Sequence, residues 1–241
     1  MTNGNNNNTF LVVDDSDIIC KSLTNFFSNY NLNVVTSHDG LDGIQKIAEY
    51  SPCLIFLDLM MPNFDGVKML QVIKVLENHK TIPVIVISGN TNRSNVLAAI
   101  EAGADRVISK PLKKEIIIKN INELLGEDFL KKQKNEKFLP AVQDEDFQKE
   151  LLKMFLKSFP AKKEAMQTGL QHFDKESIRS VAHDIRGTGS TIGYPNLSVL
   201  GVVIEDQITS SNVNWEQIKL MCSQVFSLVE EIQESNSLIE E

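Results

Sequence analysis

Acidic, hydroxyl and lysine side chains lie directly after apolar runs at four points in the first half of the chain. Asp14 and Asp15 follow "TFLVV", and Asp58 ends "CLIFLD". Ser88 ends "PVIVIS", and Lys110 follows "DRVIS". Three carboxylates held together repel one another, and a hard divalent cation with oxygen ligands, Mg²⁺ by preference, relieves that repulsion. A lysine and a hydroxyl beside such an ion would suit phosphoryl oxygens.

Each of these residues alone also has an ordinary structural explanation. Asp14 and Asp15 would form a turn and an N-cap before a helix, Ser88 a loop position, and Lys110 a surface charge. Asp58 is harder to explain in this way, because an ionised group at the end of a buried strand needs partners. The joint placement at four strand ends favours one site over unrelated residues.

A second candidate is the stretch "AHDIRGTGSTIG", which holds Gly187, Gly189 and Gly193 within seven positions. Such glycines suggest a phosphate-binding loop. A Walker-type loop needs GxxxxGK and then Ser or Thr after a strand, and a dinucleotide loop needs GxGxxG after a strand. Here the spacing is GxGxxxG and no strand pattern precedes it, so both kinds of loop are disfavoured.

The same stretch fits an amphipathic helix. At about 100° per residue, His183 lies off the apolar stripe that contains Ile185. Arg186, one turn after His183, would reach a phosphate held on the imidazole. Gly187 on the exposed face leaves the imidazole open to a docking protein, whereas Gly189 on the core side permits close helix packing. Taken alone, His183 would be an ordinary surface histidine.

The elements that would position the first set alternate between strand and helix. Short apolar runs predict strands at 9–13, 32–36, 53–58, 83–88 and 105–109. Helical spacing predicts helices at 16–30, 40–50, 66–77 and 93–103, and a fifth that Pro111 opens and that ends near residue 125. Strands without polar alternation are typical of a parallel sheet covered on both faces. The predicted fold class is an α/β doubly wound five-stranded parallel sheet, with its ligand crevice at the carboxyl ends of the strands.

The character of the chain changes after residue 126. Residues 127–140 are charged and amphipathic, and we interpret them as a linker, partly helical. Helical segments are then predicted near 143–159, 161–173, 175–192, 196–209 and 214–236. The second domain is therefore expected to be an all-α four-helix bundle, with boundaries 8–126, 127–140 and 141–236 for first domain, linker and bundle. Its core would contain Phe155, Phe159, Leu170, Ile178, Ile185, Ile192, Leu200, Ile204, Ile218, Val225 and Ile232.

The bulk properties limit the partners. The formal net charge is −8 and the pI is about 5.1, which argues against broad binding to nucleic acid or to an anionic membrane. Three separated cysteines without a CxxC pattern fit a reduced cytoplasm. The sequence shows no signal-peptide pattern and no apolar run near the ~20 residues that span a bilayer. We expect a cytoplasmic protein without membrane insertion, and its oligomeric state is left open.

The first half is similar to a known family. "VVDDS", "LDLMMPNFDG", "VIVISGN" and "AGADRVISKP" together resemble the receiver domain of two-component response regulators over residues 8–126. The resemblance implies that Asp58 is the phosphoryl acceptor and that Ser88 and Lys110 contact the phosphoryl group. It also implies a Mg²⁺ site formed by Asp14, Asp15, Asp58 and the carbonyl of Met60.

The same resemblance implies a cis peptide bond between Lys110 and Pro111, an isomer that X-Pro bonds reach at low cost. The chain departs from the family at Val107, where an aromatic ring is usual. The usual coupling of a site hydroxyl to a rotating ring is therefore put in question. Gly89 and Asn90 follow Ser88 and border the site, where they would tune the loss of phosphate to water.

The second half is similar to another family. "AHDIRGTGSTIG", with "LGVVIED" downstream, resembles the histidine phosphotransfer (HPt) domain over about residues 140–236. Ile185 and Arg186 are conservative exchanges for the usual leucine and lysine, and Gly189 replaces a residue that is usually serine or alanine. The resemblance implies that His183 is phosphorylated and that Arg186 assists.

The leading hypothesis is a phosphorelay protein that exchanges phosphoryl groups with a sensor histidine kinase, other receiver domains, or both. The sequence shows no ATP-binding kinase domain, so phosphorylation would depend on partners. One alternative is an interaction module in which phospho-Asp58 switches docking and His183 is not a phosphate carrier. Another is a phosphate sink that drains a kinase through rapid hydrolysis at Asp58.

Overall fold

The computed structural model describes residues 8–61, 66–89, 93–133 and 147–237. The chain divides into two compact units, residues 1–147 and 148–241. None of the helices in the described ranges has the length and apolar content needed to span a bilayer.

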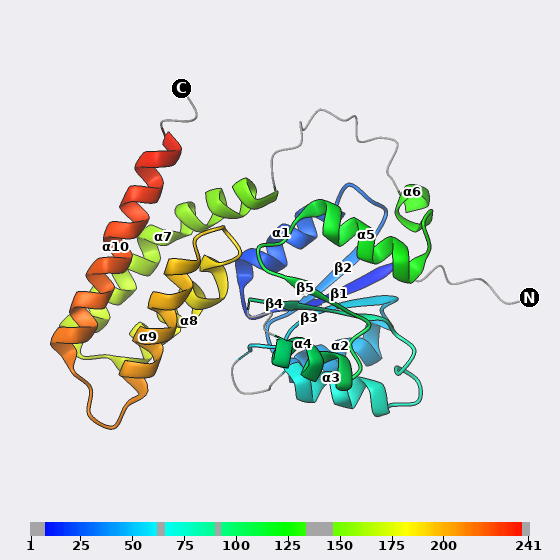
Figure 1. The fold of residues 1–241 in the computed structure, drawn as a ribbon, viewed down its shortest axis with the longest axis horizontal. Coiled ribbons are helices and arrows are strands. Elements are labelled where there is room, and N and C mark those ends of the chain that lie inside the picture. The colour runs from blue at the N-terminus through cyan, green and yellow to red at the C-terminus, as the bar shows by residue number, and fades with distance from the viewer. Residues whose placement is uncertain (1–7, 62–65, 90–92, 134–146, 238–241) are drawn as a thin grey trace, which may run out of the picture. The chain divides into compact units, whose positions relative to one another are not determined.

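The first unit is built on a five-stranded parallel sheet with strand order β2-β1-β3-β4-β5. Helices α1 and α5 cover one face of the sheet, and α2, α3 and α4 cover the other (Figure 1). The predicted α/β doubly wound fold is confirmed. The strands are β1 (Thr9–Val13), β2 (Asn33–Ser37), β3 (Leu54–Asp58), β4 (Val84–Ser88) and β5 (Arg106–Ser109). The helices are α1 (Asp17–Phe27), α2 (Gly40–Tyr50), α3 (Gly66–Val75), α4 (Arg93–Glu101) and α5 (Lys114–Leu125).

Apolar side chains on both faces of the central strands hold this unit together. Every residue of β1, β3 and β4 is buried, which explains why these strands lack polar alternation. On one face the rings of Phe10 and Phe27 meet edge to face at 5.1 Å, and Phe56 lies against both. The buried layers fix the strand ends, and the strand ends carry the candidate site.

The helix predicted to open at Pro111 begins instead at Lys114, so that prediction was wrong by one turn. Lys113 takes an extended conformation at the N-cap, and Leu112 is buried in the core. The chain must stay extended after Pro111 because this places the Leu112 side chain inside the unit before the helix starts.

A short sixth helix, α6 (Phe129–Gln133), follows α5 and packs on the first unit. The ring of Phe129 stacks on Phe10 at 6.0 Å, and Leu130 is buried. The amide of Asn31 donates to the Gln133 carbonyl at 2.6 Å. The part of the predicted linker that is described is therefore helical and anchored, while residues 134–140 lie outside the described residues.

The second unit consists of four helices, α7 (Phe147–His172), α8 (Lys175–Gly189), α9 (Pro195–Thr209) and α10 (Trp215–Ser237). The sequence predicted two separate helices before and after Pro160, and this was wrong, because α7 continues through it. Proline in a helix interior costs about 3 kcal/mol. Buried Phe155, Phe159 and Met166 on both sides of Pro160 supply packing that offsets this cost.

The bundle core agrees closely with the predicted set. Nine of the eleven predicted residues are buried, whereas Leu170 and Leu200 are only partly covered. On α9, Leu197 rather than Leu200 fills the centre of the bundle. Leu200 follows Leu197 by three residues, which turn the helix by about 300°, or about 60° short of a full turn. Leu200 therefore lies about 60° away from Leu197 around the helix axis, at the edge of the core.

Two glycines bring α8 and α9 into unusually close contact. A Cβ atom at Gly201 would lie 2.6 Å from both the Ala182 carbonyl and the Arg186 amide nitrogen. A Cβ atom at Gly189 would lie 2.5 Å from the Ser198 amide nitrogen, which confirms the predicted packing role of Gly189. The α8 backbone therefore rests directly on α9.

We expect Gly201→Ala to destabilise the second unit by roughly 1–3 kcal/mol, because the added methyl group must push the two backbones apart. Gly187→Ala is the matched control. A Cβ atom at Gly187 meets nothing within 4 Å, so alanine should stabilise the helix by roughly 0.5–1 kcal/mol. Urea unfolding followed by the fluorescence of Trp215, the single tryptophan, reports on this unit alone. Equal stability of the two variants would contradict the close contact.

Candidate functional site

The parallel register gathers the four polar strand ends of the first unit at one edge of the sheet. Asp14 follows β1, Asp58 ends β3, Ser88 ends β4, and Lys110 follows β5. All four are buried. The register that aligns them pairs Val13 with Leu57, Asp58 with Ile87 and Ser88 with Ser109.

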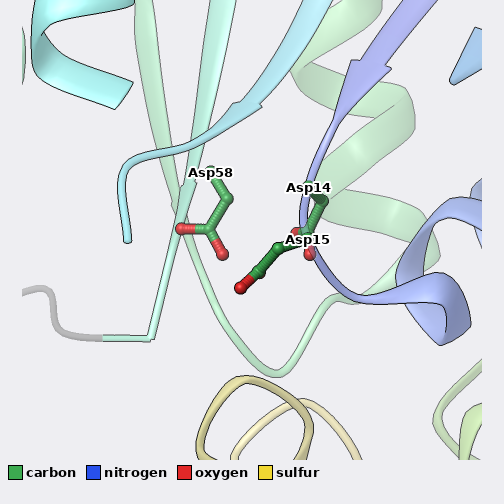
Figure 2. A group of neighbouring side chains, drawn as sticks. All are labelled: Asp14, Asp15 and Asp58. Carbon is green, nitrogen blue, oxygen red and sulfur yellow. The ribbon is translucent and has the colours of Figure 1, made fainter. Parts of the chain in front are cut away.

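Three carboxylates converge at this edge, as the sequence predicted. Asp14, Asp15 and Asp58 each offer an oxygen, and these oxygens lie within 4.8 Å of one another. Figure 2 shows the side chains of Asp58 and Asp15 pointing toward each other beside Asp14. Asp14 and Asp58 are buried, and Asp15 is partly exposed. The cluster therefore opens to solvent on the Asp15 side.

Lys110 is paired with two of these carboxylates. Its Nζ lies 2.8 Å from Oδ2 of Asp58 and 3.2 Å from Oδ2 of Asp14, and its side chain is 2% exposed. Burial alone would lower the pKa of Lys110, but the two carboxylates outweigh it and the pKa is raised. The ammonium group is therefore held charged between Asp14 and Asp58.

One lysine does not balance three carboxylates. Burial raises the pKa of Asp14 to about 7, and the charges of Asp58 and Asp15 add to the rise that Lys110 opposes. A divalent cation would remove this repulsion, and three carboxylate oxygens are the ligand type that Mg²⁺ prefers. The residues present therefore fit a magnesium ion.

Backbone amides orient two of the carboxylates. The Met60 amide donates to Oδ1 of Asp58, and the Ser16 amide donates to Oδ1 of Asp14, each at 2.9 Å. The first bond places Met60, whose carbonyl was the predicted fourth ligand, beside the cluster. A Cβ atom at Gly66 would lie 2.3 Å from the Asp58 carbonyl oxygen, so only glycine fits there. Gly66 was predicted to begin a helix and was assigned no role in the site.

The ends of β4 and β5 are joined beside the cluster. The Lys110 amide donates to the Ser88 carbonyl at 2.8 Å, and the peptide bond between Lys110 and Pro111 is cis, as expected. Val107 lies on β5, partly buried against the apolar core. Gly89 is exposed, and Asn90 lies outside the described residues.

The second candidate site lies on α8, which confirms a helix rather than a phosphate-binding loop around His183 and Arg186. The predicted helix 175–192 was wrong at its end, because α8 ends at Gly189 and residues 190–193 form a turn in which Gly193 has a φ of +91°. The Nδ1 atom of His183 lies 3.0 Å from Oε1 of Glu205 on α9. The other carboxylate oxygen, Oε2, accepts a hydrogen bond from Nη1 of Arg186 at 2.7 Å. Glu205 therefore bridges His183 and Arg186.

This geometry selects the tautomer of the imidazole. A carboxylate only accepts hydrogen bonds, so Nδ1 carries a proton, and in the neutral imidazole the lone pair is therefore on Nε2. The His183 side chain is 15% exposed, and the position of Gly187 one turn away opens to free space. On the neighbouring position of α8, Asp184 pairs with Lys162 of α7.

Glu205 is the functional residue that sequence reasoning missed. It lies within "LGVVIED", the stretch that strengthened the resemblance, but it received no role. The signal available was an acidic residue on a helix whose other faces carry valine, leucine and isoleucine. Its direction toward α8 depends on the tertiary packing at Gly201.

Two family models match the chain. The response regulator receiver domain matches residues 10–122, and the Hpt domain matches residues 150–234. The two matches fall in the two compact units, one in each.

Among similar proteins is Protein PilG of Pseudomonas aeruginosa, 34% identical over 116 residues, which are 48% of this chain and 81% of PilG. Response regulator ArlR of Staphylococcus aureus is 30% identical over 115 residues, which are 48% of this chain and 51% of ArlR. The chain thus spans only about half the length of ArlR. A putative response regulator of Chloroflexus aurantiacus has a solved structure, 24% identical with a TM-score of 0.47, covering 49% of this chain and 97% of that one. The chain belongs to the two-component response regulators and combines a receiver domain with an Hpt domain.

Proposed function

We propose that Asp58 and His183 are two phosphoryl-accepting residues of one phosphorelay protein, with a receiver domain at residues 8–126, a linker at 127–140 and an Hpt domain at 141–236. The observation that carries the proposal is the buried Lys110 ammonium group 2.8 Å from Asp58 within a cluster of three carboxylates. A purely structural ion pair needs one carboxylate, and two more would only destabilise it.

In the first domain Asp58 would be the nucleophile. One Asp58 oxygen attacks phosphorus, the new O–P bond forms as the bond from phosphorus to the donor breaks, and an acyl phosphate results. Lys110 then faces both the Asp58 carboxyl group and the incoming phosphoryl oxygens. Ser88, buried at the end of the next strand, would donate to a phosphoryl oxygen.

Asp14, Asp15 and Asp58, with the carbonyl of Met60, would hold Mg²⁺. When bound, the ion supplies positive charge that offsets the phosphoryl and carboxylate charges during transfer. Asp14 is fully buried and would bind through a carboxylate that the Ser16 amide already orients. Asp15 lies on the solvent side, where it would meet the ion as it enters.

In the second domain His183 would be the nucleophile. Its Nε2 lone pair attacks the phosphorus of an acyl phosphate, the N–P bond forms, and the O–P bond to the donor carboxylate breaks. The Nδ1 proton remains with the ring, where Glu205 accepts its hydrogen bond. Arg186, held by the same carboxylate, is close enough in the chain to turn toward the phosphoryl oxygens.

A sensor histidine kinase and the receiver domains of other proteins would be the exchange partners, and nucleic acid would not be one. A cytoplasmic location is supported by three cysteines that are all free thiols. The docking-only and phosphate-sink hypotheses use the same Asp58 site but leave the Glu205–His183 contact without a purpose.

Phosphorylation of Asp58 by acetyl phosphate should require Mg²⁺ or Mn²⁺, and Asp15→Ala should abolish it because the ion loses its solvent-side ligand. Asp17→Ala is the matched control, since Asp17 is an exposed carboxylate paired with Lys21. Incorporated phosphate is measured by mass spectrometry of the intact protein. Full labelling in excess chelator would show that the carboxylates do not act through a metal.

The two acceptors should carry chemically different phosphate. Phosphohistidine is labile in acid and survives base, whereas phosphoaspartate is lost rapidly in base. Asp58→Asn, labelled by a phosphorylated receiver, should therefore hold only acid-labile, base-stable phosphate. His183→Gln, labelled by acetyl phosphate, should hold only base-labile phosphate. If Asp58→Asn takes no label from any phosphorylated receiver, the second domain acts in docking alone.

Glu205→Gln should slow phosphoryl acceptance by His183 on the order of tenfold, because glutamine no longer fixes the Nδ1 proton. The ¹⁵N shifts of the imidazole should change from one tautomer to a mixture. Asp206→Asn, next to Glu205 on the exposed side of α9, should change neither the rate nor the shifts. An unaltered tautomer and rate in Glu205→Gln would remove Glu205 from the mechanism.

A further inference from the structure

A groove of about 510 Å³ lies between α9 and α10 of the second unit. Its apolar lining comes from Val199 and Leu200 on α9 and from Leu228 on α10, and its polar lining includes Ser223, Ser227 and Glu231. From Ser223 to Glu231 the groove follows α10 for about 12 Å, which is roughly two helical turns.

Exposed apolar side chains extend the groove. Val199 and Leu220 are each 60% exposed, and Val203 is 36% exposed. Val203 lies one turn beyond Val199 on α9, and Leu220 lies one turn before Gln224, which lines the groove on α10. Side chains four residues apart share a helix face, so these residues form one apolar strip along the groove.

The charge of these two helices is strongly negative. Helix α9 holds Glu205 and Asp206 and no lysine or arginine. Helix α10 holds four glutamates and one lysine, Lys219. Glu205 contacts His183 and Arg186, and Glu230 pairs with Lys163 of α7, so the other four acids and Lys219 leave a net charge of −3 on the two helices. A second copy of this face would bring like charges together, which disfavours self-association.

We propose that the α9–α10 groove docks a basic amphipathic helix of a partner protein. Two turns of that helix would place apolar side chains at i, i+3 or i+4, and i+7 over Val199, Leu200 and Leu228. Lysine or arginine side chains on its flank would meet Glu231. The length of the groove, its apolar strip and the negative charge of its two helices each match this class of ligand.

The groove is separate from the His183 site. Glu205 points toward α8, where it contacts His183 and Arg186. Leu200, five residues earlier, lies about 140° away around α9 and lines the groove with α10. A partner in the groove therefore leaves His183 able to react.

The test uses the full chain and a fluorescent leucine–lysine peptide with leucines at i, i+3, i+4 and i+7, compared with a scrambled peptide of equal composition. At physiological ionic strength the patterned peptide should bind at least tenfold more tightly than the scrambled one. Amide shifts should change at Val199, Leu200 and Leu228. Equal binding of both peptides, no binding, or shifts confined to other residues would overturn the proposal.

Val199→Glu separates apolar docking from attraction by charge alone. The change adds a negative charge to an exposed position, so binding by charge alone would strengthen, whereas groove docking should weaken at least tenfold. Leu41→Glu adds the same charge at a 69% exposed leucine of the other unit and should leave affinity unchanged. Glu231→Gln should weaken binding severalfold. Self-association of the native chain that Val199→Glu abolishes would assign the groove to a second copy and overturn the proposal.

Discussion

The first unit depends on keeping like charges together at the edge of a buried sheet. Asp14 and Asp58 lie at the ends of neighbouring strands, and neither can move away from the other without breaking the strand register. The Lys110 ammonium group between them offsets part of the repulsion. Removing one partner of such a buried pair typically costs 3–5 kcal/mol, because the remaining charge is left uncompensated. The carboxylates are therefore held in a state that additional positive charge stabilises, and this is the property that a divalent-cation site requires.

In the second unit, a contact between two helices, α8 and α9, controls the candidate site. A histidine on a helix surface has two ring nitrogens, and its reactivity depends on which one carries the proton. Glu205 decides this for His183, and it can do so only because α9 approaches α8 at Gly201. A Cβ atom at position 201 would lie 2.6 Å from the Ala182 carbonyl oxygen and the Arg186 amide nitrogen, so a larger residue would push the two helices apart. Gly201, which contacts neither His183 nor Glu205 through a side chain, thus supports the candidate site through helix packing.

The first site could be predicted almost completely from sequence, because each of its residues follows a strand directly. The order of the strands brings their ends together, so local position was enough to place Asp58 and Lys110. Glu205 and Gly201 could not be found in this way, since they act across a contact between two helices whose relative rotation is set by packing. The continuation of α7 through Pro160 could not be predicted for the same reason, because it also depends on packing between helices. The local rule for proline is correct, but the packing of buried Phe155 and Phe159 before Pro160 and of buried Met166 after it overrides the rule.

The two candidate residues, Asp58 and His183, differ in accessibility, and this constrains the chemistry that the proposed function assigns to them. Asp58 is 3% exposed and lies among charged groups at the edge of the sheet, so the donor in the proposed function must be a narrow group that reaches inward. The His183 side chain is 15% exposed on a convex helix, beside a glycine position that opens to free space. A partly exposed imidazole on a helix face can approach a buried carboxylate more easily than a second buried carboxylate could. The proposed exchange thus pairs a buried acceptor on a sheet edge with a more accessible one on a helix face.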